Sequence, residues 1–163
     1  MSRLDAFIRR MQAQRACIDA VADHLQGRAG PVLELGLGNG RTYDHLRVRF
    51  PGHEIYVFDR QVAAHPECIP PAEMLRLGEI RQTIPAFAGE AQPGAVLIHA
   101  DIGSGDKAAS VQLTADLAPH WVRILAPGGF LASDQTVDQA GLDPWPLPAG
   151  VETGRYHLYR KAG

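Results

Sequence analysis

The sequence has few cysteines and no long hydrophobic run, and each absence excludes a class of protein. Cys17 and Cys68 are its two cysteines and form no CxxC motif, so we expect neither a disulfide framework nor a zinc site. No apolar run approaches the roughly 18 residues that span a bilayer. The polar N-terminus does not have the pattern of a secretory signal. We therefore expect a cytoplasmic protein without membrane contact.

An excess of charge of one sign is also missing. The formal net charge is -2, which gives no electrostatic attraction to nucleic acid, and we expect a small-molecule substrate instead. Internal repeats and low-complexity tracts are absent. A chain of 163 residues suits one domain, with an N-terminal helix in residues 1–27 and a core in residues 28–163.

Residues 2–26 have helical periodicity. Leu4, Phe7, Ile8 and Met11 begin an apolar series at spacings of three and four residues. This pattern predicts an amphipathic helix that packs over the rest of the fold or against a second copy of the chain. A homodimer is therefore a possible assembly.

The remaining sequence alternates between short apolar runs and helical stretches. We predict strands at residues 32–35, 54–58, 74–77, 95–100 and 130–132, and helices at 41–50, 82–88 and 107–125. Pro119 predicts a break or kink in the last of these helices. Residues 151–160 suit a terminal antiparallel hairpin. The alternation predicts an α/β fold with a mostly parallel sheet covered on both faces.

A glycine-rich loop follows the first predicted strand. The segment Glu34-Leu35-Gly36-Leu37-Gly38-Asn39-Gly40 places a carboxylate two residues before a GxGxG pattern. Glycines let a backbone turn sharply and approach a ligand closely. The spacing differs from the GxGxxG of dinucleotide-binding folds. We therefore predict that this loop holds a different cofactor.

Asp59 ends the second predicted strand. An acidic residue at this position can accept hydrogen bonds from ribose hydroxyl groups. It could instead cap the segment that follows. We favour the ribose role because the strand, glycine loop, helix and second strand occur in the order that this role requires.

Five segments together resemble the class I (Rossmann-like) S-adenosylmethionine-dependent methyltransferase family, in a compact bacterial form of unknown substrate. They are VLELGLGNGRT, IYVFDR, RLGEI, AVLIHADIG and LAPGGFLASD. The resemblance implies a Rossmann-like three-layer α/β/α sandwich with an antiparallel C-terminal hairpin strand. It also implies methyl transfer from S-adenosyl-L-methionine, with S-adenosyl-L-homocysteine as the product.

The resemblance also implies roles for individual residues. Glu34 and the loop Gly36, Leu37, Gly38, Asn39 and Gly40 would hold the methionine end of the cofactor, and Asp59 the ribose, flanked by Arg60. Glu79 and the backbone of Ile80 would meet the adenine, while Asp101 would sit near the sulfonium and the substrate. Because residues 61–72 are rich in proline where the family has a helix, Glu79 is less firmly placed than Asp59.

The candidates for proton removal are Asp101, His99 and Asp134, with His65 as a further histidine. His99 and Asp101 are two residues apart on a predicted strand, so their side chains share one face. A histidine can accept a proton near neutral pH. His99 could equally be a histidine whose hydrogen bonds are satisfied within the sheet.

Two neighbouring features have alternative interpretations. Asp101, Asp134 and Gln135 partly resemble the metal site of cation-dependent O-methyltransferases, but the ligand set is incomplete and we predict no metal. Asp106 could be a further ligand of such a site, but a helix cap is the simpler interpretation of this residue. The proline-rich residues 143–148 could wall the substrate pocket, or form a connector with Trp145 packed on the core.

Two other functions stay open from the sequence. The first is a nicotinamide-dependent oxidoreductase, which the glycine spacing and the lack of a Tyr-x-x-x-Lys pattern disfavour. The second is a non-catalytic S-adenosylmethionine-binding module that acts through a partner protein.

Overall fold

The fold is described from a computed structural model, which covers residues 2–90 and 94–163. Its helices and strands are, in chain order, α1 (Arg3–His24), β1 (Val32–Leu35), α2 (Arg41–Arg49), β2 (Ile55–Asp59), the 3-10 helices at Pro66–Cys68 and Ala72–Met74, β3 (Leu75–Leu77), α3 (Ile80–Gly89), β4 (Ala95–Ala100), α4 (Lys107–Ile124), β5 (Leu125–Ser133), β6 (Leu142–Pro144) and β7 (His157–Lys161).

All of these strands join one sheet in the order β3-β2-β1-β4-β5-β7-β6. The pairs from β3 across to β5 are parallel, and β7 runs antiparallel to both β5 and β6. The strand order reverses direction along the chain between β1 and β4. Open α/β sheets bind ligands outside the carboxyl ends of the strands at such a point.

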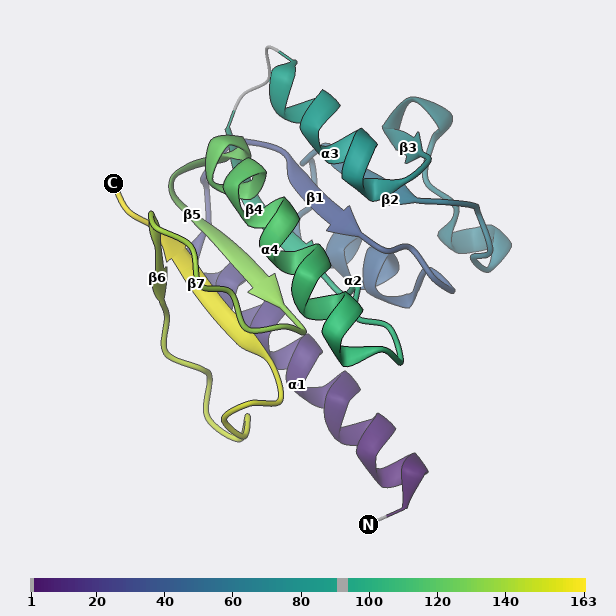
Figure 1. The fold of residues 1–163 in the computed structure, drawn as a ribbon. Coiled ribbons are helices and arrows are strands. Elements are labelled where there is room, and N and C mark those ends of the chain that lie inside the picture. The colour runs from purple at the N-terminus through teal and green to yellow at the C-terminus, as the bar shows by residue number, and fades with distance from the viewer. Residues whose placement is uncertain (1, 91–93) are drawn as a thin grey trace.

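Helices cover both faces of the sheet (Figure 1). On one face, Ile18 of α1 and Leu46 of α2 belong to the same buried hydrophobic cluster. On the other face, Phe87 of α3 and Trp121 of α4 pack in a second cluster. Alternate residues of a strand point to opposite faces, so β1, β2, β4, β5 and β7 each contribute to both clusters. The predicted three-layer α/β/α fold is confirmed.

Helix α1 begins with a capping box and extends beyond the sheet. The Ser2 hydroxyl accepts a hydrogen bond from the Asp5 amide, and the Asp5 carboxylate accepts one from the Ser2 amide. The buried residues of α1 start at Ala13. Its N-terminal half therefore projects past the end of the sheet, as Figure 1 shows. In the part of the chain that the structure describes, no helix is long and apolar enough to cross a membrane.

The predicted helices and strands are present, and several of their limits differ from the prediction. Helix α4 continues through Pro119, so of the predicted break or kink the break does not occur. Strand β5 starts at Leu125 rather than at residue 130, because its first residues pair with the start of β4. Helix α3 begins two residues earlier than predicted, directly after Glu79.

The proline-rich residues 143–148 hold the largest difference. Leu142–Pro144 forms β6, an edge strand that the sequence did not predict, where prolines are tolerated. Trp145 packs edge-on against Phe130 and lies beside Arg160. This position is near the amino end of the parallel strands, away from the glycine loop. Trp145 packs against the core, as the connector alternative expects.

Candidate functional site

A cleft of about 380 Å³ lies at the carboxyl ends of β1, β2 and β4. Its floor includes the glycine loop after β1 and the segment after β4. Helix α1 forms one wall, with Phe7, Met11 and Gln14. The lining residues are Phe7, Arg10, Met11, Gln14, Gly36, Leu37, Gly38, Asn39, Arg41, Thr42, Asp59, Asp101, Ile102 and Gly103. Sequence positions that were predicted separately thus meet in one cavity.

The glycine loop adopts a backbone that other residues would strain. Gly36 has a φ of 93°, and a Cβ atom there would lie 2.8 Å from the carbonyl oxygen of Asp101. Gly38 also has a positive φ, of 50°, and has open space beside its Cα atom. The loop therefore packs closely against the segment after β4 and leaves its other side free for a ligand.

Asp59 fixes the conformation of this loop. One carboxylate oxygen, Oδ2, accepts hydrogen bonds from the backbone amides of Leu37 at 2.8 Å and Gly38 at 3.2 Å. The other oxygen, Oδ1, accepts one from the amide of Arg60 at 2.6 Å. The amide of Gln61 also lies 3.5 Å from Oδ1, so four backbone amides occupy the roughly four acceptor positions of the carboxylate, and a ligand hydroxyl group would share Asp59 with them.

Arg60 and Glu79 form an exposed ion pair next to Asp59. Arg60 Nε lies 2.8 Å from Glu79 Oε1. Glu79 precedes α3 as its N-cap residue, but its side chain makes no capping hydrogen bond. Ile80 is the first residue of α3 and packs partly buried against the core. These residues lie at the edge of the site, and the lining of the cleft does not include them.

Glu34 lies inside the protein beneath the glycine loop. Its side chain is buried, and Oε2 lies 2.5 Å from Nδ1 of His99 on the neighbouring strand β4. Its second oxygen, Oε1, is buried without a hydrogen-bond partner among the described residues. Burial raises the pKa of this carboxyl, while the pairing with His99 opposes that shift. In this conformation Glu34 does not reach the cleft.

His99 is fully buried and makes several polar contacts. Its Nε2 atom lies 2.5 Å from the Tyr156 hydroxyl and 3.1 Å from the Gln14 amide nitrogen. Burial alone would lower the pKa of His99, but the charge and hydrogen bond of Glu34, together with the charges of Asp101 and Asp134, outweigh burial, and the pKa is raised. The surroundings match the alternative of a histidine satisfied within the sheet. With 0% exposure, His99 cannot touch a ligand in the cleft.

Asp101 borders the cleft directly after β4. Its Oδ2 atom accepts hydrogen bonds from Gln14 Nε2 at 3.0 Å and from Arg10 at 3.4 Å. The side chain keeps 19% of its surface exposed. His99 and Asp101 contact the same Gln14 side chain, which confirms that they share one face of the strand. Asp101 therefore connects the buried polar groups with the open cleft.

Asp134 lies beside Asp101, after β5. Its Oδ2 atom accepts hydrogen bonds from the amide of Gly103 and from the side chain of Gln135, both at 3.0 Å. Burial raises the pKa of Asp134, and its Oδ1 atom is buried without a partner among the described residues. Over residues 2–90 and 94–163, no group of three or more His, Cys, Asp and Glu side chains could hold a metal ion.

Other predicted side chains lie elsewhere. His65 is exposed, and its ring caps the 3-10 helix Pro66–Cys68. Asp106 is the N-cap residue of α4, where it accepts a hydrogen bond from the amide of Ala109 at 3.0 Å. The prediction of a cap at Asp106 is therefore confirmed.

An apolar groove of about 410 Å³ adjoins the cleft between α1 and α2. Phe7, Met11 and Ile18 provide apolar surface, and Arg15, Arg41, Thr42, His45 and Gln14 complete the lining. Phe7, Met11 and Gln14 line both cavities. No separate sequence signal marked these residues, because the periodicity of α1 predicted only that the helix would pack against other surfaces.

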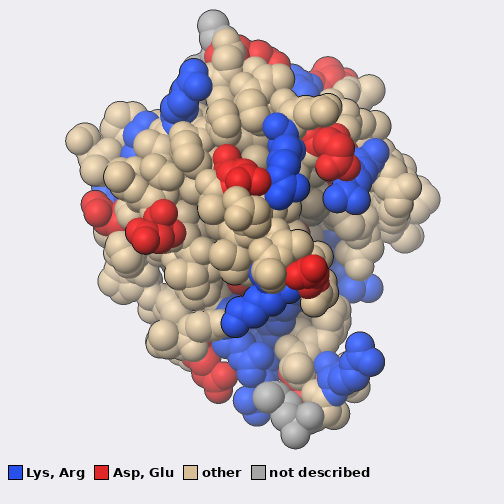
Figure 2. Space-filling view, in the orientation of Figure 1, with Lys and Arg blue, Asp and Glu red and all other residues tan. Residues whose placement is uncertain are grey.

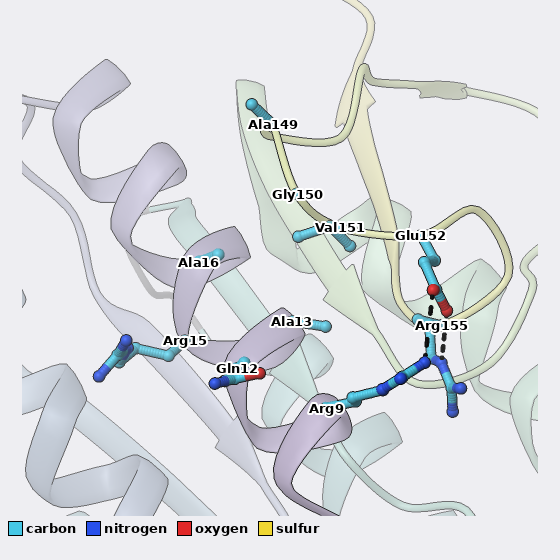
Figure 3. Close-up of a pocket in the computed structure, with 10 residues that line it drawn as sticks. All are labelled: Arg9, Gln12, Ala13, Arg15, Ala16, Ala149, Gly150, Val151, Glu152 and Arg155. Carbon is cyan, nitrogen blue, oxygen red and sulfur yellow. Dashed lines mark hydrogen bonds and ion pairs between the residues drawn. The ribbon is translucent and has the colours of Figure 1, made fainter. Parts of the chain in front are cut away.

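A third hollow lies on the other side of α1, beside the loop before β7 (Figure 3). Its volume is about 430 Å³. Arg9 and Arg155 both point toward Glu152, at 3.6 Å and 3.2 Å (Figure 3). The carboxylate is thus shared between two arginines, and this hollow is separated from the cleft by the helix.

The comparisons with known proteins agree with this geometry. A sequence model of a family described as S-adenosyl-L-methionine methyltransferase matches residues 1–161. A crystal structure of an S-adenosyl-L-methionine methyl transferase from Silicibacter pomeroyi DSS-3 is 44% identical. That match covers 99% of each chain, with a TM-score of 0.93. Among curated proteins, no relative matches this sequence.

More distant structures share the fold. TrmN from Thermus thermophilus is 19% identical over 88% of this chain and 48% of its own, with a TM-score of 0.63. Human methyltransferase-like protein 13, crystallised with S-adenosylhomocysteine, is 15% identical over 94% of this chain and 81% of its own, with a TM-score of 0.61. The family match across nearly the whole chain decides against the nicotinamide alternative: this chain belongs to the S-adenosyl-L-methionine methyltransferase family.

Proposed function

We propose that this methyltransferase acts on a small molecule, with S-adenosyl-L-methionine held in the cleft above the glycine loop. The observation that carries the proposal is the meeting of the loop, Asp59 and Asp101 around a cavity of about 380 Å³. Small-ligand sites commonly occupy a few hundred cubic ångströms. Binding of a small molecule in this cleft does not require a surplus of positive or negative charge on the protein.

The residues around the cleft fit this cofactor. The close packing of Gly36 on Asp101 and the open side of Gly38 leave a cradle that a side chain on the loop would fill. Asp59 lines the cleft, where ribose hydroxyl groups would share its oxygens with the backbone amides, of which Gly38 and Gln61 make the longest contacts. Arg60, Glu79 and Ile80 stand at the edge where the adenine would lie. Leu37, Asn39 and Gly40 complete the loop, and Glu34 supports it from below.

The bound cofactor supplies a methyl group on a positively charged sulfur atom. The protein's part is to bind, to orient and to exclude water. Asp101 offers a carboxylate toward that charge. Asp134, with its raised pKa, is the candidate for holding a proton taken from the acceptor. His99 would act only through its contacts with other protein groups, because its burial prevents direct contact with the acceptor.

The apolar groove beside the cleft supports a small and partly apolar acceptor. Phe7, Met11 and Ile18 would cover apolar parts of such a molecule. Acidic and basic side chains are interspersed over most of the face in Figure 2, apart from the basic end formed by α1. This distribution gives little support for a nucleic-acid acceptor.

We also infer the setting of the enzyme. Residues 1–163 would form one methyltransferase domain of a cytoplasmic, bacterial protein that works as a homodimer. Both cysteines are free, which suits a reducing compartment. The apolar side chains of Leu4, Phe7 and Ile8 are 65%, 45% and 43% exposed on the projecting half of α1, and a second copy would cover them.

Calorimetry with S-adenosyl-L-methionine, S-adenosyl-L-homocysteine and NAD tests the cofactor site. We expect binding of the two adenosyl ligands and none of NAD. Asp59→Ala should weaken both by about tenfold or more, because it removes charged hydrogen-bond acceptors. Asp116→Ala is the control, since Asp116 lies on the exposed surface of α4. Unchanged affinity in Asp59→Ala would contradict the proposed site.

Turnover measurements test the acceptor. Formation of S-adenosyl-L-homocysteine with a panel of small metabolites supports the proposal. Formation only with RNA or protein acceptors contradicts it. Tight cofactor binding without turnover of any acceptor would favour the binding-module alternative.

A further inference from the structure

Helix α1 inserts one polar side chain into the protein between β4 and the cleft. Gln14 is only 4% exposed, although glutamine is usually a surface residue. Its neighbours on the buried side of the helix are apolar, among them Cys17 and Ile18. A polar group at this depth is expected to make hydrogen bonds, because an unpaired one is costly.

The amide nitrogen of Gln14 joins two groups on β4 and its extension. It lies 3.0 Å from Asp101 Oδ2 and 3.1 Å from His99 Nε2. His99 in turn contacts Glu34 and Tyr156. The result is a continuous row of polar contacts from β1, beneath the glycine loop, to the wall of the cleft.

Asp101 and Gln14 are the members of this row that line the cleft, and the orientation of Asp101 depends on α1. Its Oδ2 atom has side-chain donors on two residues of that helix, Gln14 at 3.0 Å and Arg10 at 3.4 Å. Arg10 is long and half exposed, whereas Gln14 is held in place by its buried surroundings. Gln14 therefore contributes the more rigid of the two contacts.

We propose that Gln14 is a positioning residue for methyl transfer, which fixes the Asp101 carboxylate in the cofactor cleft. The inference rests on the proposed function, in which Asp101 acts on the positive charge of the cofactor. A fixed carboxylate attracts that charge without the cost of being ordered on binding. Helix α1 is then part of the functional site as well as of the core.

The substitution Gln14→Met tests this role. Methionine keeps the length and approximate volume of the side chain but removes the N–H donors. The matched control is Gln12→Met on the same helix, because Gln12 is exposed and lines the hollow on the far side of α1. Affinities for S-adenosyl-L-methionine and S-adenosyl-L-homocysteine are measured by calorimetry, together with the thermal midpoint.

We expect Gln14→Met to weaken S-adenosyl-L-methionine binding about tenfold, the usual scale for one hydrogen bond to a charged group. Binding of S-adenosyl-L-homocysteine should change less, since it lacks the sulfonium charge. Asp101→Asn should show the same selectivity, and Gln12→Met should match the original protein. If Gln14→Met does not fold, Gln14→Asn retracts the amide by one methylene group and should give the same selective loss.

A purely structural role gives a different result. Equal losses for both ligands, in step with a lowered thermal midpoint, would overturn the inference. So would unchanged affinity in Gln14→Met alongside a selective loss in Asp101→Asn. Failure of the original protein to bind either adenosyl ligand would instead reject the proposed function itself.

Discussion

Gly36 is the residue at which the glycine loop, β1 and the segment after β4 come closest together. Its backbone lies in a region that L side chains rarely adopt, and the carbonyl oxygen of Asp101 occupies the space of a side chain. Any other residue must move one of the two backbones that form the cleft floor. The identity of this residue therefore affects both stability and binding.

We expect Gly36→Ala to lower the free energy of unfolding by roughly 2–3 kcal/mol and to weaken cofactor binding. The control is Gly52→Ala, which has a similar φ of 81° but no atom within 4 Å of the added Cβ. That variant should cost about 1–2 kcal/mol, from backbone strain alone, and leave binding intact. Urea unfolding and calorimetry provide the two measurements. Equal effects of both variants would disprove the role of the close contact.

The raised pKa of Asp134 predicts that the stability of the protein depends on pH. Burial raises this pKa in the folded protein above the value of about 3.9 in an unfolded chain. The folded state then favours the protonated form. The resulting stabilisation is present below the unfolded pKa and is lost as the pH rises through the folded pKa.

Asp134→Asn should therefore become more stable relative to the original protein as the pH rises from about 4, because asparagine does not ionise. Asparagine can still accept the hydrogen bond from Gly103. Thermal midpoints measured at a series of pH values test this. A stability difference that stays constant across the series would show that ionised Asp134 carries no burial cost.

At the scale of elements, α4 shows how tertiary packing overrides a local signal. Pro119 lacks an amide proton and leaves one helical hydrogen bond unmade. The helix nevertheless continues, because Leu117 and Trp121 on either side of the proline are buried against the sheet. Pro119 itself points to solvent. Packing on both sides thus holds the helix together across the proline.

Pro119→Ala should stabilise the protein by about 1–2 kcal/mol. It restores the missing hydrogen bond and improves helix propensity, while the unfolded chain gains some freedom. Pro146→Ala is the control, since Pro146 lies outside the helices and strands and should be neutral or slightly destabilising. Chemical denaturation measures both. Destabilisation in Pro119→Ala would mean that the proline favours the native backbone at this position.

At the scale of the whole molecule, the projecting half of α1 is the main exposed apolar feature among the described residues that lies beside the site. The series Leu4, Phe7, Ile8 and Met11 continues the helical periodicity beyond the sheet. Phe7 and Met11 also line the cleft. An interface on this surface would therefore lie close to the cofactor.

The double substitution of Leu4→Glu and Ile8→Glu should convert the proposed homodimer into a monomer, because like charges would replace apolar contacts. Val111→Glu changes an equally exposed apolar residue on α4 and should leave the dimer intact. Sedimentation equilibrium gives the molecular mass of each. A monomeric original protein, or a dimer in all three, would exclude this interface.

Sequence periodicity and motifs predicted most of the fold. Strand β4 was placed at its observed limits, and the helix predicted over residues 2–26 is present as α1. Edge strand β6 was missed, because it is short, includes Pro144 and pairs only with β7. The glycine loop, Asp59 and Asp101 could be selected because each directly follows a strand in a recognisable motif.

The sequence alone determined which strands carry polar residues at their carboxyl ends, and that these ends would share one edge of a parallel sheet. Local patterns suffice for this, because strand direction and glycine spacing are properties of short segments. Only the tertiary structure decided which polar groups reach the cleft. Glu34 and His99 pair inside the protein while the partly exposed Asp101 borders the cleft, and Gln14 arrives from a helix about 90 residues away in the chain. Such contacts depend on how α1 packs across the sheet, which no local pattern records.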